Sequence, residues 1–288
     1  MIEVINTILP VFLIILIGFV IGKKKKPDIQ PIVDLVVYLS APCLIFTSMA
    51  KSDISISEFG LMSVATAAFV GLMFFSAFIL FKMTKSNFNG LYLPMVFGNS
   101  AFLAYPVALL AFGNYGLSRA VVFDIINSLF LYSAGIYLLN KKSGIKSAFK
   151  VPLIYGVIGG IIVNVIKLPI PSAFFKPMEL IGAIAIPAAL MILGFRLAEI
   201  RLTHIKTAIF ASSFKIFFGF FIGLAVAFLF SIEGVDRNII LLQASMPSAV
   251  MTMVLCQKYD QDCGLVASTV FISTVISAFT IPLVIGFM

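Results

Sequence analysis

Polar residues and prolines interrupt two otherwise apolar stretches of this chain. The first interruption reads Gly-Asn-Ser-Ala-Phe-Leu-Ala-Tyr-Pro over residues 98–106, and the second reads Gln-Ala-Ser-Met-Pro-Ser over residues 243–248. Inside a membrane an unpaired backbone group is costly, so a spanning helix breaks only where the freed N–H and C=O groups face protein or a wet cavity. The two interruptions therefore predict one shared binding site built from the ends of half-helices.

The residues of the interruptions offer donors, acceptors and helix ends. A helical half that starts near Pro106 would present unpaired N–H groups, which suit an anion, whereas a half that ends near Gly98 would present carbonyls, which suit a cation. Proline also occurs in spanning helices as a simple kink, but polar residues accompany the proline in both stretches. We therefore predict a substrate site that is formed by Asn99, Ser100, Tyr105, Pro106, Gln243, Ser245, Pro247 and Ser248.

Ionisable residues inside apolar stretches indicate a second function. Asp124 and Asn127 lie about one helical turn apart and hence on one face of a helix. An acid within a membrane usually marks an ion path or a paired charge, so we expect a coupling ion here, either a proton or a sodium ion. Lys215 is an alternative partner for Asp124, although snorkelling to the cytoplasmic interface is the favoured interpretation. The predicted ion-coupling residues are Asp124, Asn127, Ser273 and Thr274.

Composition places these residues in an all-α polytopic membrane protein. The 288 residues are 61% hydrophobic and 11% charged, whereas soluble domains are about one-quarter charged. The mean hydropathy is +1.14. Runs of about 20 apolar residues cross a bilayer, and ten transmembrane helices are expected at about 4–22, 31–50, 59–83, 91–113, 117–140, 151–168, 177–198, 206–230, 237–257 and 264–287. The fourth and ninth of these spans are the broken ones.

Positive charge predicts the orientation of the chain. With the N-terminus outside, fourteen of the 20 Lys and Arg residues fall in cytoplasmic loops, including Lys85 and four lysines at 141–150. Arg119 and Lys51 are among the few that fall on the opposite side. The positive-inside rule then predicts a multi-pass protein of the cell membrane with both termini extracellular. Because the net charge of +8 is scattered over several loops, nucleic-acid binding is not expected.

The chain carries an internal repeat. When residues 1–143 are laid over 150–288, similar positions match, for example Pro42 with Pro187. Each half holds five predicted spans, an odd number, so the second half must enter the membrane from the opposite side. The sequence therefore predicts two inverted five-helix repeats in which helices 4 and 9 are broken and cross.

Enzyme chemistry has no support in the sequence. No loop exceeds about ten residues, too few for a separate domain. The chain lacks a phosphate-binding loop, a His-Glu-x-x-His motif and a nucleophile elbow, and a membrane protease or transferase would need a nucleophile with its base. Cys43, Cys256 and Cys263 show no metal-ligand or redox spacing, so we predict neither a metal nor a cofactor.

The order of several motifs resembles that of a known family. They are Gly-Asn-Ser at 98–100, Tyr-Pro at 105–106, Leu-Gly-Phe-Arg-Leu at 193–197, Ser-Met-Pro-Ser-Ala at 245–249, and Tyr259 followed by an acid. Over its whole length the chain resembles the auxin efflux carrier family, which includes prokaryotic malate and malonate permeases. It lacks the long central loop of the plant members and so looks like the short prokaryotic form.

The resemblance implies an architecture and a substrate class. Spans 1, 2, 6 and 7 would form a scaffold, spans 3–5 and 8–10 a moving transport domain, and the scaffold would support a homodimer. The family's substrates are organic anions. We therefore expect a bilayer-embedded secondary transporter (permease) that moves a small carboxylate, by symport or uniport, from a site where helices 4 and 9 cross. A membrane receptor or a channel-like pore with the same fold is the alternative.

Overall fold

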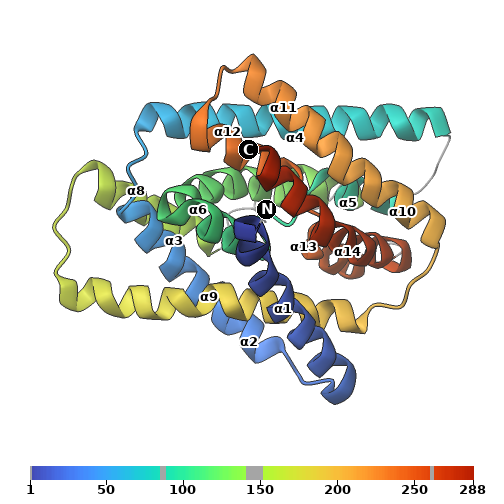
Figure 1. The fold of residues 1–288 in the computed structure, drawn as a ribbon, viewed down its shortest axis with the longest axis horizontal. Coiled ribbons are helices and arrows are strands. Elements are labelled where there is room, and N and C mark those ends of the chain that lie inside the picture. The colour runs from blue at the N-terminus through green and yellow to red at the C-terminus, as the bar shows by residue number, and fades with distance from the viewer. Residues whose placement is uncertain (1, 85–88, 141–151, 260–262) are drawn as a thin grey trace.

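The computed structural model describes residues 2–84, 89–140, 152–259 and 263–288. The described residues are helical apart from turns, loops and one isolated β-bridge. In Figure 1, α4 crosses the upper part of the molecule and α9 the lower part, and α5, α6 and α13 lie between them. Lys85 and most of the predicted linker, residues 141–147, lie outside the described residues.

Seven helices form the first half of the described chain, with π-helical turns at Val36–Ser40 and Leu131–Gly135. The first of these turns joins α2 to α3, so that 30–50 is one continuous rod. The helices are α1 (Ile2–Lys25), α2 (Gln30–Leu35), α3 (Ala41–Ala50), α4 (Ile56–Thr84), α5 (Tyr92–Val96), α6 (Ala104–Phe130) and α7 (Ile136–Leu139).

Seven helices also form the second half of the described chain. A third π-helical turn, Phe214–Phe218, joins α10 to α11 in one rod. The helices are α8 (Leu153–Val165), α9 (Ser172–Glu199), α10 (Ile205–Ser213), α11 (Gly219–Leu229), α12 (Gly234–Ala244), α13 (Val250–Lys258) and α14 (Cys263–Phe287).

The length and the surface of the helices identify a polytopic membrane protein. Seven helical segments of the described chain are long and apolar enough to cross a membrane, and large side chains such as Phe228, Phe279 and Leu283 are more than two-thirds exposed. Hydrocarbon solvates such side chains, whereas water does not. The predicted class, an all-helical polytopic membrane protein, is confirmed at this level. The remaining helices, α8 among them with 13 residues, are shorter.

The predicted fourth and fifth spans meet without a loop. α6 continues through residues 114–116, where a short loop was expected, and changes direction at Gly113. The backbone of Gly113 has φ 64° and ψ −161°, a combination that only glycine adopts readily. Two helical segments can therefore join at a single residue.

The helices pack in two sets. α9 packs on α1 and α3, and α3 also packs on α8; in the other set α4 and α12 pack on α6, α11 packs on α12, and α10 and α13 pack on α14. Contacts of α1 with α6 and α14, and of α3 with α6, join the two sets. The candidate site lies where they meet.

Candidate functional site

The structure brings the two interruptions together. The backbone N–H of Asn99 donates to the carbonyl of Pro247 at 2.7 Å, and the N–H of Ala249 donates to the carbonyl of Phe97 at 3.0 Å. Gly98 and Ser248 thereby form an isolated antiparallel bridge. Each interruption pairs backbone groups that the other leaves free, which explains how two helices can break inside the fold.

Prolines and a serine fix the ends of the four half-helices. Pro106 stands in the first turn of α6, where a missing N–H costs nothing. At the other break the hydroxyl of Ser248 donates to the carbonyl of Pro94 at 2.6 Å and ties α5 to the second interruption. Phe97 and Ala249 have extended backbones and end the helical geometry on either side of the crossing.

A cavity of about 140 Å³ opens beside the crossing. Its walls are the first interruption, the first turns of α6 and α13, the second segment of α6, the π-helical turns at 36–40 and 131–135, and parts of α3, α8 and α9. Most of the lining is apolar, with side chains such as Phe102, Tyr132 and Met251. Both sets of helices therefore contribute to one small cavity with few polar groups.

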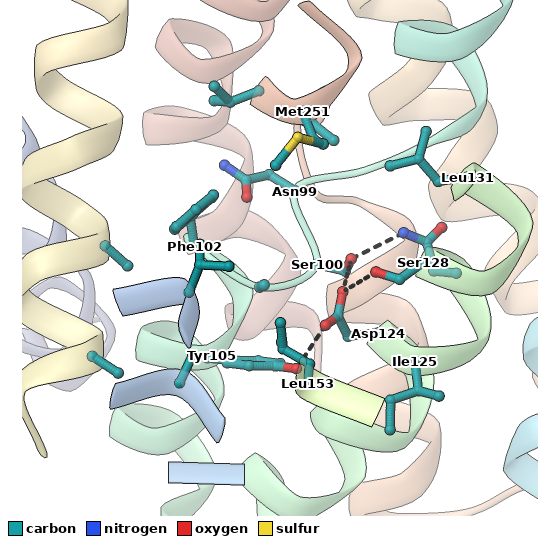
Figure 2. A pocket seen from close by; sticks show the side chains of 18 of the residues that line it. Asn99, Ser100, Phe102, Tyr105, Asp124, Ile125, Ser128, Leu131, Leu153 and Met251 are labelled. Carbon is teal, nitrogen blue, oxygen red and sulfur yellow. Dashed lines mark hydrogen bonds between the residues drawn. The ribbon is translucent and has the colours of Figure 1, made fainter. Parts of the chain in front are cut away.

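Asp124 is the acidic group of this cavity, and hydroxyls surround it. Its carboxylate accepts hydrogen bonds from Ser100 Oγ at 2.5 Å, Tyr105 OH at 2.7 Å and Ser128 Oγ at 3.3 Å. Figure 2 shows the carboxylate between Ser100 and Tyr105. Asp124 is 3% exposed. The network joins the first interruption to the second segment of α6.

Two side-chain amides at the cavity keep atoms that bond to none of the described residues. Asn127 donates through Nδ2 to Ser100 Oγ at 2.9 Å, but its Oδ1 is buried and unpaired. Asn99 Nδ2 is likewise buried and unpaired, and the residue lines the cavity (Figure 2). A buried donor or acceptor without a partner is costly. Asn99 Nδ2 is such a donor and Asn127 Oδ1 such an acceptor.

The predicted residues of the second interruption lie behind the cavity wall. Gln243 Nε2 donates to the carbonyls of Ser100 and Ala120 at 3.2 and 3.1 Å, and Ser245 Oγ donates to Leu241 O. Neither residue lines the cavity, and nor do Pro247 and Ser248. Gln243 and Ser248 bond across the crossing, and the neighbouring Ala249, Val250 and Met251 line the cavity instead.

Ser273 and Thr274 belong to the same support. Ser273 Oγ accepts the N–H of Ser248 at 3.0 Å and donates to Val270 O. Thr274 donates to Val270 O at 2.8 Å within its own helix. Both residues are buried and neither lines the cavity. The structure thus places Asp124 and Asn127 at the cavity and their two predicted counterparts in α14 behind it.

Sequence reasoning missed Ser128 and the π-helical turns. Ser128 lies four residues after Asp124, on the same helical face, and this spacing is a signal that was available. Two of the three π-helical turns in the described chain line the cavity, at Val36–Ser40 and Leu131–Gly135. Such turns occur frequently at functional sites, but no residue pattern marked them here.

Two basic residues are buried beside α12. The favoured interpretation that Lys215 snorkels to the interface is wrong, because its side chain is 0% exposed and its Nζ donates to the carbonyl of Ala244 at 3.0 Å. In the described residues Lys215 makes no ion pair with Asp124. Arg119, expected on the external side, is buried in α6, and its Nε donates to Asp236 Oδ1 at 2.9 Å. Asp236 of α12 compensates the charge of Arg119, and the C-terminal end of α12 compensates the charge of Lys215.

Comparison with known proteins extends over nearly the whole chain. The profile of a family described as "Membrane transport protein" matches residues 3–148 and 141–285. An uncharacterized transporter of Methanocaldococcus jannaschii is 33% identical over 96% of both chains, and one of Methanothermobacter thermautotrophicus is 30% identical over 96% of both. The uncharacterized transporter YfdV of Escherichia coli is 21% identical over 89% of this chain and 88% of its own.

The broken helices, the cavity at their crossing and the profile match lead to one assignment. The profile covers nearly all of both halves, and the resemblance inferred from the motif order is confirmed. The chain is a membrane protein that belongs to the membrane transport protein family of the auxin efflux carrier type.

Proposed function

We propose that this chain is a secondary transporter that moves a small organic anion, a carboxylate, by alternating access. The substrate binds in the cavity where the fourth and ninth spans cross. The observation that carries the proposal is the buried, unpaired amide N–H of Asn99 in a cavity that also meets the first turns of α6 and α13.

The chemistry of this cavity suits a carboxylate. The first N–H groups of a helix have no partner within the helix and carry partial positive charge, and helix N-termini bind anions for this reason. Val250 and Met251 lie in such a first turn, that of α13, and line the cavity. The first turn of α6 offers no free N–H of this kind, because Pro106 has none and the N–H groups of Ala104 and Tyr105 already donate to carbonyls of the first interruption. The cavity's 140 Å³ is close to the roughly 150 Å³ of an engineered cavity that binds benzene. The ligand is therefore a small molecule.

The proposal includes the architecture of the transporter. The chain forms ten spans in two inverted repeats, 1–143 and 150–288, with both termini extracellular. α1, α2, α3, α8 and α9 form the scaffold and the site of a homodimer, and the other helices move. The separate packing of the two helix sets supports this division, as does a cavity with walls from both sets.

Coupling is assigned to the side of the cavity that holds Asp124 and Asn127. A carboxyl held by three hydroxyls, one of them on the first interruption, can link its own charge to the position of that interruption. Ser273 supports the same region through the N–H of Ser248. We place proton or sodium coupling here.

A receptor or channel-like pore with the same fold is the second candidate. It would bind the anion without flux, or conduct it without saturation. Saturable uptake with counterflow of unlabelled carboxylate into proteoliposomes favours the carrier, whereas binding without flux favours the receptor.

The test of the proposed site is Asn99→Ala. Loss of one hydrogen bond to a charged group costs about 1.5–3 kcal/mol, so malonate or malate transport should weaken about 10- to 100-fold. Asn99→Asp should be at least as severe, because it places a negative charge where the anion binds. Ser76→Ala, which removes a hydroxyl that bonds only within α4, is the control. Unchanged transport in folded Asn99→Ala removes the residue from the site.

A further inference from the structure

One charged side chain near the crossing takes no part in the proposed anion cavity. Lys215 lies in the π-helical turn Phe214–Phe218, halfway along the rod formed by α10 and α11. Its side chain is fully buried. An ionisable group inside a membrane is costly, and such a group generally marks a functional site.

The ammonium of Lys215 lies at the C-terminal end of a half-helix. Nζ donates to the carbonyl of Ala244, the last residue of α12, at 3.0 Å. Nζ also lies next to Gly98, which follows the end of α5 by two residues. A Cβ added to Gly98 would lie 3.3 Å from Nζ. The carbonyls that end a helix are unpaired within the helix and carry partial negative charge. This is the place at the crossing that favours a cation.

No carboxylate of the described residues forms an ion pair with this ammonium. Asp124 is bonded to hydroxyls instead. The ring of Phe69, 5.9 Å from Nζ, is the aromatic neighbour. A buried ammonium without a carboxylate needs other negative groups around it, and the carbonyl of Ala244 at the end of α12 is one.

We propose that the Lys215 ammonium takes the place of a coupling metal ion at the end of α12, so that the crossing carries its own cation and transport needs no sodium. The inference rests on the proposed function for the substrate. It leaves a proton on the Asp124 side, or uniport, as the mode of transport.

The first test uses no substrate. The melting temperature of the purified protein is measured in NaCl and in choline chloride at matched ionic strength. The wild type should melt at the same temperature in both salts. Lys215→Ser empties the place of the ammonium and leaves the carbonyl of Ala244 free, so Na⁺ should raise its melting temperature by roughly 2–4 °C. Lys206→Ser, which removes an exposed lysine of the same rod, should behave like the wild type.

A sodium-specific stabilisation of the wild type overturns the inference, whether or not any variant folds. If Lys215→Ser does not fold, Lys215→Arg and Lys215→Met provide the second comparison, since both keep a long side chain and only the first keeps the charge. With malonate in choline chloride as the probe, Lys215→Arg should keep the ligand-induced shift and Lys215→Met should lose it.

The two proposals fail in different ways. If malonate and malate stabilise no form of the protein, the proposed substrate class is wrong, while the comparison of sodium and choline still decides the role of Lys215. If Lys215→Met responds to malonate as the wild type does, the role of its charge is wrong, while the anion site stands.

Discussion

At the residue scale, hydroxyls rather than a cation compensate the charge of Asp124. The Ser100 hydroxyl both donates to the carboxylate and accepts from Asn127, so one serine of the first interruption connects both polar residues of the second segment of α6. Any change of charge on Asp124 would change the bond that holds this interruption. The network around Asp124 can therefore bind a coupling ion and transmit the change of charge to the first interruption.

Asp124→Asn tests this link. The new amide nitrogen cannot accept a hydrogen bond, so one of the hydroxyl donors loses its acceptor, at a cost of about 1–3 kcal/mol. We expect carboxylate uptake into proteoliposomes to fall about tenfold or more while the protein remains folded by thermal denaturation. Tyr105→Phe, which removes one donor and keeps the ring, should have the smaller effect. Full uptake by Asp124→Asn would exclude the carboxylate from the transport cycle.

The sequence predicted one half of the site better than the other. Asn99, Ser100, Tyr105, Pro106, Asp124 and Asn127 line the cavity as a group, because a polar break and a polar helical face are local patterns. The residues of the second interruption were predicted from the same kind of polar break, but they lie behind the cavity wall, where Gln243 and Ser248 bond across the crossing. Which side of a break faces a cavity depends on how the two breaks cross, and local sequence does not contain that information.

At the element scale, close contact between α1 and α9 depends on glycine. A Cβ added to Gly194 would lie 2.2 Å from the carbonyl oxygen of Ile15, and one added to Gly18 would lie 2.5 Å from that of Met191. Helices in membranes associate through small residues that let backbones approach. These two glycines therefore set the distance between two long helices of the proposed scaffold.

Gly194→Ala should destabilise the protein, although alanine is normally the better helix former. The methyl group would meet backbone that cannot move aside, and overpacking of this kind costs about 1–3 kcal/mol. Thermal denaturation in detergent measures the effect. Gly286→Ala is the matched control, because nothing lies within 4 Å of its added Cβ. If both variants have the same melting temperature, the contact of α1 with α9 does not limit stability.

The elements themselves were largely predictable from apolar runs. Long runs near 59–83, 177–198 and 264–287 coincide with α4, α9 and α14 to within a few residues at most ends. The π-helical turns within two rods could not be predicted, because neighbouring helices rather than local residues stabilise the extra residue in such a turn. The direct join of the two segments of α6 at Gly113 was also missed. In the sequence, an apolar run that ends at a loop looks the same as one that ends at a single glycine.

At the scale of the whole molecule, aromatic contacts mark both sets of helices. Phe19 of α1 and Phe271 of α14 have ring centroids 6.2 Å apart and join the two sets. Phe46 of α3 and Phe175 of α9 have centroids 6.3 Å apart within one set. If the sets move relative to each other during transport, only the first pair changes its separation.

Cross-linking these pairs tests the motion. With Cys43, Cys256 and Cys263 replaced by serine, Phe19→Cys with Phe271→Cys should form a cross-link with a short, reducible thiol reagent. This cross-link should abolish carboxylate uptake, because alternating access needs the two sets to change their relative position. Reduction should restore uptake, which excludes damage by the substitutions. Phe46→Cys with Phe175→Cys joins helices of one set, so its cross-link should leave uptake unchanged. Undiminished uptake by the first cross-linked protein would contradict the moving-bundle proposal, because the anion would then cross while the two sets are held together.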